Sequence, residues 1–289
     1  MSIDFKRTGG LKMTIHMRFP GGLRKAITFS YDDAVEQDIR LVDIFDKHGL
    51  RGTFNINTGS FSPEGKVHPE GRIHRRMTEK QTYDLLANSN HEVAVHTLTH
   101  PYLERMPAAS ATYEVLGDKI NIEKLFGKIT RGLAYPFGTY STAVMELLKA
   151  CGIAYARATT TTSNFNLPKN WLYWEPTTHH RNPNLMNLAK KFIEETPIRA
   201  PWVFYIWGHS YEFEQADNWH VMEELADYVA FKDDVWYATN IEIYEYVEAY
   251  NSMHLSADCK IMHNPTCREL FFEVDDKIFS IQPGQTITL

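Results

Sequence analysis

The sequence predicts an α/β fold in which about seven parallel strands form a distorted (β/α) barrel. Short apolar runs alternate with stretches of helical periodicity through most of the 289 residues, and such alternation is typical of parallel sheets with crossover helices. Seven strand–helix units at this length favour closure into a barrel. From about Ser252 the pattern changes to short strands and turns, which indicates a small antiparallel β appendage. We therefore expect a barrel domain over residues 1–251, with an N-terminal β extension, and the appendage over residues 252–289.

Each expected barrel strand is a short apolar run, and helix start and stop signals follow most of them. Thr78 to Gln81 form a capping-box pattern, Ser141 is a candidate N-cap, and Gly127 ends a helix. The polar segment after the second strand is long enough to form a rim over a site. Strands are expected at 13–18, 26–29, 51–56, 93–96, 131–135, 153–157, 202–207, 235–238, 259–263, 269–274, 277–281 and 286–289, and helices at 34–48, 78–86, 111–126, 141–151, 183–195, 217–231 and 241–250.

The composition excludes several classes of function. The net charge is −6, with both signs interspersed, which favours neither nucleic acid nor an anionic membrane as a partner. Three cysteines without a CxxC pair indicate neither a disulfide framework nor a thiolate zinc site. We see no signal peptide or membrane span in the sequence, so the expected location is cytoplasmic. The appendage is expected to pack on the barrel or to build a homo-oligomer.

Two adjacent carboxylates mark the first candidate site. Asp32 and Asp33 follow the strand that begins at Ala26, where a helix is expected to start, and parallel α/β folds build their sites at this edge. A helix cap is the alternative use of such a pair. Two carboxylates a few Å apart repel each other, so the pKa of one of them rises. A metal ion bound to one carboxylate would resolve this conflict and leave the other free to act as a base.

Two further strand ends carry histidines. His96 and His100 follow the third barrel strand, and their i, i+4 spacing would place both on one face of a helical turn, where they can share a metal. Together with Asp33 they would supply two imidazoles and one carboxylate and leave a position open for water. His209 follows the sixth strand, and both a third metal ligand and a general acid are open to it. Pro136 to Gly138 form a tight turn whose backbone N–H could hold an oxyanion.

These motifs resemble the polysaccharide deacetylase family, the NodB-homology domains of carbohydrate esterase family four, over about residues 23–250. Tyr31-Asp32-Asp33 matches the family's first motif, His96 to His100 its second, Pro136-Phe137-Gly138 part of its third and, more loosely, Trp207-Gly208-His209 its fifth. The resemblance implies Asp32 as catalytic base, Asp33, His96 and His100 as metal ligands, the Phe137 backbone N–H as oxyanion donor and His209 as general acid.

Two positions depart from the family pattern. The third motif usually opens with an arginine that tethers the catalytic aspartate, but Ala134 stands there. We predict that Arg157, at the end of the next strand, replaces it, because its planar guanidinium suits a carboxylate; a solvent-exposed arginine is the alternative. The fourth motif, which tunes the acid histidine, is not recognisable. Glu175 is the nearest candidate for the carboxylate beside His209.

The sequence thus predicts a hydrolase of non-peptide C–N bonds that removes acetyl groups from an N-acetylated sugar or oligosaccharide. The resemblance implies one divalent metal ion, zinc or alternatively cobalt, nickel or manganese. An enzyme of the same fold that acts on O-acetyl esters or cyclic amides is one alternative, and an inactive carbohydrate-binding protein is another. The expected partner is a carbohydrate or small amide. Trp171, Trp174, Trp202, Trp207 and Trp219 are candidates for sugar-stacking faces, with burial in the core as the alternative.

Overall fold

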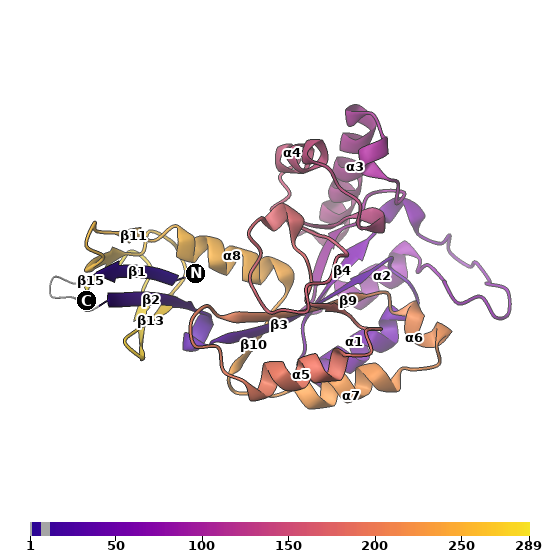
Figure 1. The fold of residues 1–289 in the computed structure, drawn as a ribbon. Coiled ribbons are helices and arrows are strands. Elements are labelled where there is room, and N and C mark those ends of the chain that lie inside the picture. Colours follow the sequence, from indigo (N-terminus) through magenta and orange to yellow (C-terminus); the bar gives the residue numbers. More distant parts are fainter. Residues whose placement is uncertain (1, 7–11) are drawn as a thin grey trace.

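The computed structural model describes residues 2–6 and 12–289, and its centre is a curled sheet of eight parallel strands (Figure 1). Strand β3 lies in the middle of this sheet and every one of its residues is buried. In sheet order the strands are β7 (Tyr155–Arg157), β6 (Gly132–Ala134), β5 (Glu92–Val95), β4 (Gly52–Ile56), β3 (Lys25–Asp32), β9 (Trp202–Gly208) and β8 (Thr178–His179), and β10 (Val235–Tyr237) pairs with the first half of β3. The predicted distorted barrel is therefore confirmed.

All seven predicted barrel strands are present, and the structure adds an eighth. Strand β8 has only two residues, which is too short to show any periodicity in sequence. Strands β7 and β8 form the two edges of the curled sheet. The segment of chain between them in the sequence connects these edges. Trp174 donates its N–H to Ala156 O (2.9 Å) and accepts from Ala158 N–H (3.0 Å), so this irregular segment runs beside β7 before it enters β8. Closure through a loop rather than a ladder explains why the sheet is curled but not a complete barrel.

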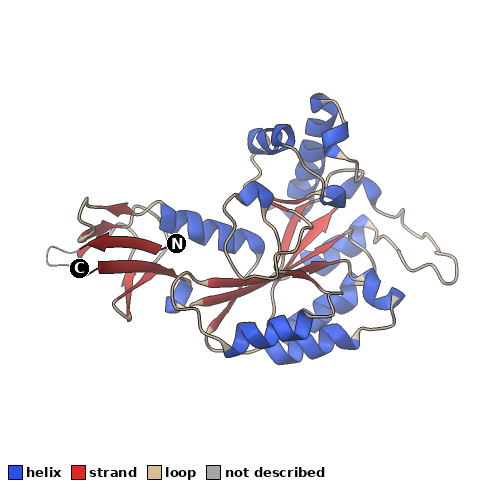
Figure 2. Cartoon of the chain, in the orientation of Figure 1, coloured by secondary structure: helices blue, strands red, loops and turns tan. Residues whose placement is uncertain are grey.

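The helices cover the outside of the sheet (Figure 2). They are α1 (Asp38–Lys47), α2 (Glu79–Leu86), α3 (Ala108–Phe126), α4 (Thr142–Ala150), α5 (Leu185–Glu194), α6 (Tyr211–Gln215), α7 (His220–Val229) and α8 (Asn240–Asn251), with short 3₁₀ turns at Pro20–Gly22, Thr58–Ser60, Leu103–Arg105, Pro136–Gly138 and Trp171–Tyr173. The capping box of Thr78 and Gln81 and the Ser141 cap are confirmed. Among the described helices, none is both long and apolar enough to cross a membrane.

Helix α1 begins four residues later than the sequence indicates. The backbone at Val35 forms an antiparallel bridge with Arg76, and its N–H donates to the Asp38 carboxylate (3.0 Å), which holds residues 33–37 out of the helix. The apolar face of α1 still packs on the sheet. Phe45 lies 4.7 Å from the Phe29 ring and 6.0 Å from the Tyr31 ring, between centroids. Full burial of such a side chain contributes about 1.5–3 kcal/mol, so β3 is held rigidly below the site.

The two ends of the chain meet in the β appendage (Figure 1, left). Strand β2 (Lys12–Arg18) lies between β1 (Ser2–Lys6) and β13 (Leu270–Val274), and β14 (Lys277–Ile281) completes this antiparallel sheet. A second, three-stranded sheet contains β11 (His254–Leu255), β12 (Ile261–His263) and β15 (Thr286–Thr288). The pairing of β2 with β13 was not predicted, because no local pattern reports a partner at the far end of the sequence.

A buried ion-pair network fastens the appendage to the chain that enters β3. Glu273 of β13 accepts from Arg18 Nε (2.8 Å) and from Arg24 Nη2 (2.8 Å). The Arg18 side chain is completely buried, and its Nη1 also donates to the backbone oxygens of Met17 and Arg199. Because an unpaired buried charge is costly, Glu273 is the residue on which this junction depends.

We predict that Glu273→Gln lowers the free energy of unfolding by about 3–5 kcal/mol, because it leaves the Arg18 guanidinium buried without a counter-charge. Urea denaturation followed by circular dichroism measures this difference. Glu269→Gln is the control, since Glu269 is a partly exposed neighbour whose side chain hydrogen-bonds only to Gln282 among the described residues, and its substitution should change stability by less than about 0.5 kcal/mol. Equal unfolding midpoints for the two variants would contradict the assignment.

Candidate metal and catalytic site

The predicted site residues gather at the carboxyl ends of the strands. Asp32 is the last residue of β3, His96 follows β5, Arg157 ends β7 and His209 follows β9. The side chains of the other three residues all lie close to the Asp32 carboxylate. His96 Nε2 and His209 Nε2 each lie 3.8 Å from Asp32 Oδ2, and Arg157 Nη2 donates to the same oxygen. Ligands of parallel α/β sheets bind at this edge, and the candidate catalytic residues of this chain lie there.

Asp33, His96 and His100 form a group that could hold a metal ion, with one donor atom from each residue and all three within 4.8 Å of one another. The predicted helical turn between the histidines is wrong. Thr97 and His100 have left-handed backbones, with φ of 66° and 60°, so the segment is a tight loop. The loop still brings the two imidazole rings close together, with 4.7 Å between their centroids. The turns of the loop, and not the i, i+4 spacing of a helix, place the rings side by side.

The hydrogen bond of His96 decides its tautomer. Its Nδ1 lies 2.8 Å from Ala134 O, which can only accept, so Nδ1 carries the proton and Nε2 bears the lone pair. Among the described residues Nε2 is buried and has no hydrogen-bond partner. Burial lowers the pKa of His96 to about 4 although Asp32 and Asp33 oppose the shift, so the ring is neutral at pH 7. A neutral imidazole oriented through its second nitrogen is a typical metal ligand, and the group therefore fits a divalent metal.

Asp33 leaves the strand conformation, with φ of 91°. In a regular strand Asp32 and Asp33 would point to opposite faces of the sheet. The turned backbone instead directs both carboxylates at one imidazole, since His96 Nε2 lies 3.8 Å from Asp32 Oδ2 and 4.0 Å from Asp33 Oδ1. Left-handed backbones at non-glycine residues cost about 1–3 kcal/mol and persist where the surroundings enforce them. The strain at Asp33 is therefore part of how this site is built.

Two basic side chains hold the Asp33 carboxylate from the side. Arg76 Nη2 donates to Oδ1 (2.9 Å), and His74 Nε2 lies 3.3 Å from Oδ2. Burial alone would raise the pKa of Asp33, but the His74 hydrogen bond and the Arg76 charge hold it far below its ordinary value. Asp33 is thus ionised at any working pH. Neither Arg76 nor His74 was singled out in the sequence, because both lie in the long segment between β4 and α2.

The negative charge of Asp32 is compensated by Arg157, the arginine at the end of β7. Arg157 Nη2 donates to Oδ2, and Asn55 Nδ2 donates to Oδ1 (2.8 Å). Burial would raise the pKa of Asp32, but Arg157, His96 and His209 together outweigh this effect, so the pKa lies below its ordinary value. The Arg157 side chain is 1 % exposed and its guanidinium lies 4.5 Å from the centre of the Trp207 ring. Arg157 is therefore a buried partner of Asp32 and not a surface residue.

His209 has a different carboxylate beside it from the one the sequence suggests. Its Nδ1 lies 3.6 Å from Glu212 Oε2, whereas Glu175 accepts from the Tyr173 hydroxyl (2.9 Å). Burial lowers the pKa of His209, but Glu212 and Asp32 outweigh it and raise the pKa above its ordinary value. Glu212 stands three residues after His209, one turn along the chain, and this spacing could have revealed it.

A second group of possible metal donors, His179, His180 and Glu212, behaves differently. The backbone N–H of Arg181 donates to His179 Nδ1 (3.1 Å), so the ring proton lies on Nε2 and points at Glu212 Oε2, 3.2 Å away. A protonated nitrogen cannot ligate a metal. His180 Nε2 lies equally close to the same oxygen. This second group is therefore a cluster of two imidazoles in close contact with Glu212, which lies next to His209.

The glycine in Trp207-Gly208-His209 has a steric role in this cluster. A Cβ at position 208 would lie 2.1 Å from His180 Nδ1, which is far inside van der Waals contact. The His180 ring stacks between Tyr31 and Phe213, at 5.6 and 4.1 Å between centroids. Only glycine leaves room for this ring against β9, so the motif positions His180 as well as His209.

The turn with Phe137 lies next to the metal-binding group. Phe137 has φ of 57°, and its half-exposed ring lies 4.4 Å from the His100 ring and stacks on Tyr102 at 3.9 Å. Of the tryptophans proposed as sugar-stacking faces, Trp174 is buried and Trp207 lies against Arg157. In and directly after this turn, Phe137 and Tyr140 carry exposed aromatic rings.

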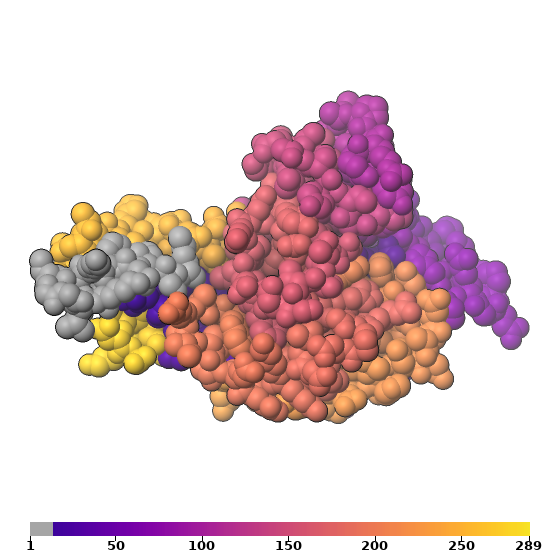
Figure 3. All heavy atoms as spheres, in the orientation of Figure 1, coloured from indigo at the N-terminus to yellow at the C-terminus, as the bar shows by residue number. Residues whose placement is uncertain are grey.

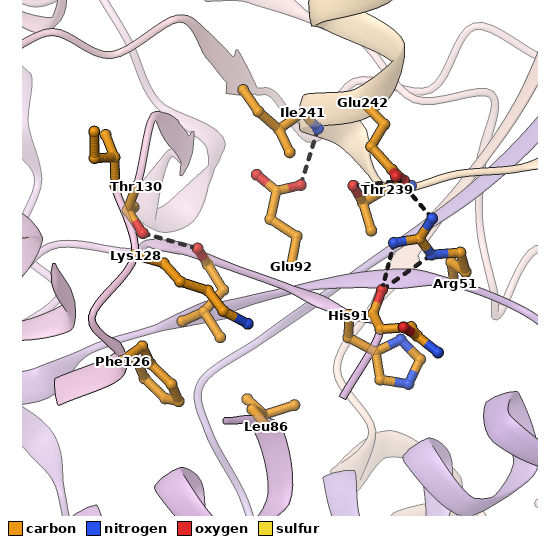
Figure 4. Close-up of a pocket in the computed structure, with 13 residues that line it drawn as sticks. Arg51, Leu86, His91, Glu92, Phe126, Lys128, Thr130, Thr239, Ile241 and Glu242 are labelled. Carbon is orange, nitrogen blue, oxygen red and sulfur yellow. Dashed lines mark hydrogen bonds and ion pairs between the residues drawn. The ribbon is translucent and has the colours of Figure 1, made fainter. Parts of the chain in front are cut away.

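The pocket in Figure 4 lies away from these residues. Its volume is about 260 Å³ and it opens at the amino end of β5, where Glu92 begins the strand. The Glu92 carboxylate accepts from Ile241 N–H (2.9 Å), Thr53 Oγ1 (2.8 Å) and Tyr155 OH (2.7 Å). Glu92 therefore ties the start of helix α8 to the sheet, which is a structural role for this partly buried carboxylate.

Comparison with known proteins gives a match over part of the chain. Residues 19–156, just under half of the 289 residues, match the model of the polysaccharide deacetylases. The matched range contains Asp32, Asp33, His96, His100 and the Phe137 turn, and it ends just before Arg157. No curated protein matches the sequence significantly.

Two solved structures with TM-scores above 0.5 share the fold of this chain. A protein from Mycobacterium smegmatis assigned as a polysaccharide deacetylase is 16% identical, with a TM-score of 0.54 over 82% of this chain and 94% of that chain. Puue allantoinase is 12% identical, with a TM-score of 0.59 over 80% and 92%. The deacetylase PplD of Streptococcus pyogenes, solved with acetate, is 21% identical with a TM-score of 0.41, and the match spans 46% of this chain and only 55% of PplD.

We predict that Glu212→Gln lowers the pKa of His209, because the variant loses the negative charge that favours the imidazolium. NMR titration of the histidine ring protons, with His209→Ala to assign the signal, measures the change. Glu175→Gln is the matched control and should leave the titration unaltered, since Glu175 contacts Tyr173 instead. A His209 pKa that responds to Glu175 and not to Glu212 would reverse the assignment.

Proposed function

We propose that this chain is a metal-dependent hydrolase that removes acetyl groups from an N-acetylated sugar or oligosaccharide. The observation that carries the proposal is the group of Asp33, His96 and His100, in which the tautomer of His96 leaves a buried lone pair facing the other donors. A base candidate and an acid candidate, Asp32 and His209, stand directly beside this group. The match of residues 19–156 to the polysaccharide deacetylase model supports deacetylation as the reaction.

Asp33, His96 and His100 would hold the metal ion, and Zn²⁺ is the ion this donor set suits best. A divalent ion bound there supplies Lewis acidity, which polarises an acetyl carbonyl and makes bound water more acidic. Asp32 accepts the proton of the attacking water, because Arg157 and Asn55 keep its carboxylate ionised and fixed. The Phe137 backbone N–H is the proposed donor to the oxyanion of the tetrahedral intermediate.

His209 then protonates the leaving amine. Its pKa is raised above that of an ordinary histidine, which favours the imidazolium form, and its Nε2 lies 3.8 Å from Asp32 Oδ2, so acid and base share one site. Glu212 stabilises the positive charge and orients the ring from the Nδ1 side. Amines are poor leaving groups, so this proton is needed more for amides than for esters.

We expect about one divalent metal ion per chain after reconstitution with Zn²⁺, and release of acetate from N-acetylated oligosaccharides that depends on it. Elemental analysis and an enzymatic acetate assay measure the two quantities, with O-acetyl esters and cyclic amides tested in parallel. The double variant His96→Ala/His100→Ala should lose both. His179→Ala is the matched control and should retain the metal, because its tautomer excludes it as a ligand.

Two outcomes would count against this function. Unchanged metal content in the double variant would reject the ligand set. Turnover of cyclic amides without any release of acetate from sugars would leave the ligands intact but assign the chain to a different substrate class.

Asp32 and Asp33 should fail in different ways. Asp33→Asn removes a charged ligand, so metal affinity should fall. Asp32→Asn keeps the three ligands, so the metal should stay while kcat falls by roughly 10²–10⁴, the contribution of a general base. Metal titration with a competing chelator, followed by steady-state kinetics on the same samples, separates the two effects. Equal loss of metal in both variants would show that the roles are misassigned.

A further inference from the structure

A basic pocket lies beside the metal-binding group, under the long segment between β4 and α2. This segment projects from the side of the molecule (purple, at the right in Figures 1 and 3). The pocket has a volume of about 240 Å³ and its wall contains five basic side chains and no carboxylate. The basic residues are Lys66, His68, Arg72, His74 and Arg76.

The positive charge of this pocket runs against the composition of the chain, in which 36 acidic residues outnumber 30 basic ones. Across residues 2–6 and 12–289, neither the Lys66 ammonium nor the Arg72 guanidinium forms an ion pair with a carboxylate. Arg72 Nε donates only to a backbone oxygen, that of His74 (3.0 Å). The other three basic residues have carboxylates outside the lining, since Asp33 contacts Arg76 (2.9 Å) and His74 (3.3 Å) and Glu36 Oε1 lies 4.0 Å from His68 Nε2. Lys66 and Arg72 are thus two exposed cations that line the pocket without a carboxylate partner.

The pocket adjoins the proposed reaction centre through shared residues. His74 and Arg76 both line the pocket and contact the two oxygens of Asp33, at 3.3 and 2.9 Å. A molecule whose acetyl group lies at Asp32 and Asp33 therefore has this pocket as its immediate neighbour on the Arg76 side.

We propose that this pocket binds an oxyanion of the substrate (a carboxylate, sulfate or phosphate) and so selects acidic N-acetylated sugars over neutral ones; the proposal rests on the deacetylase function proposed above. Lys66 supplies a mobile point charge and Arg72 a planar fork, two complementary ways to bind an oxyanion. This selection of acidic over neutral sugars involves no change in the proposed metal ligands.

Calorimetric titration with N-acetylglucosamine and with its 6-sulfate, 6-phosphate and C6-carboxylate analogues tests the proposal. The metal-loaded wild type should bind at least one anionic sugar about tenfold or more tightly than the neutral one, since charged hydrogen bonds contribute about 1.5–3 kcal/mol. The rank of the three analogues identifies the anion. Lys66→Gln/Arg72→Gln should abolish the preference and leave binding of the neutral sugar unchanged.

Arg40→Gln/Lys149→Gln is the control, because it removes the same charge from exposed positions outside the pocket and should keep the preference. Equal affinity of the wild type for all four sugars, with no binding of inorganic sulfate, would overturn the proposal. A preference that survives Lys66→Gln/Arg72→Gln would do the same. Sulfate binding that needs Lys66 and Arg72, in a protein that releases no acetate from any sugar, would support the pocket and reject the deacetylase function.

Discussion

The site depends on the burial of one charge, the carboxylate of Asp32, and on its compensation by Arg157. An ionised group with almost no exposure to solvent is stable only with a partner of opposite charge. Arg157 fulfils this role from the end of β7, held against Trp207 and covered by the irregular segment that runs on to β8.

Compensation of charge also explains how two carboxylates stand side by side. The strained backbone at Asp33 turns its side chain to the same face as Asp32, and Arg76 and His74 bind its oxygens there. Each carboxylate oxygen has two lone pairs, so these contacts leave acceptor capacity for a metal ion. Each aspartate has its own basic partners, which keeps both ionised although they are only one residue apart.

The acid side of the site follows the same principle with different residues. Glu212 lies among His179, His180 and His209, and Gly208 leaves room for the His180 ring. The tautomer of each histidine decides its chemistry: a backbone carbonyl fixes a free Nε2 on His96, whereas a backbone N–H fixes a protonated Nε2 on His179. Two groups that are alike in composition therefore act in different ways, one suited to a metal and one to holding a carboxylate.

The sequence by itself determined the fold class, the seven main barrel strands and the residues placed at their ends, because apolar periodicity and the strand-end motifs are local properties. It also placed Arg157 at the right edge, since the ends of parallel strands meet there. Only the tertiary structure decided which side chains touch. Glu212 in place of Glu175, the roles of Arg76 and His74, the loop between His96 and His100, and the pairing of β2 with β13 all depend on backbone turns and contacts between distant segments. A linear pattern does not encode these, because each is the outcome of packing and charge compensation over the whole chain.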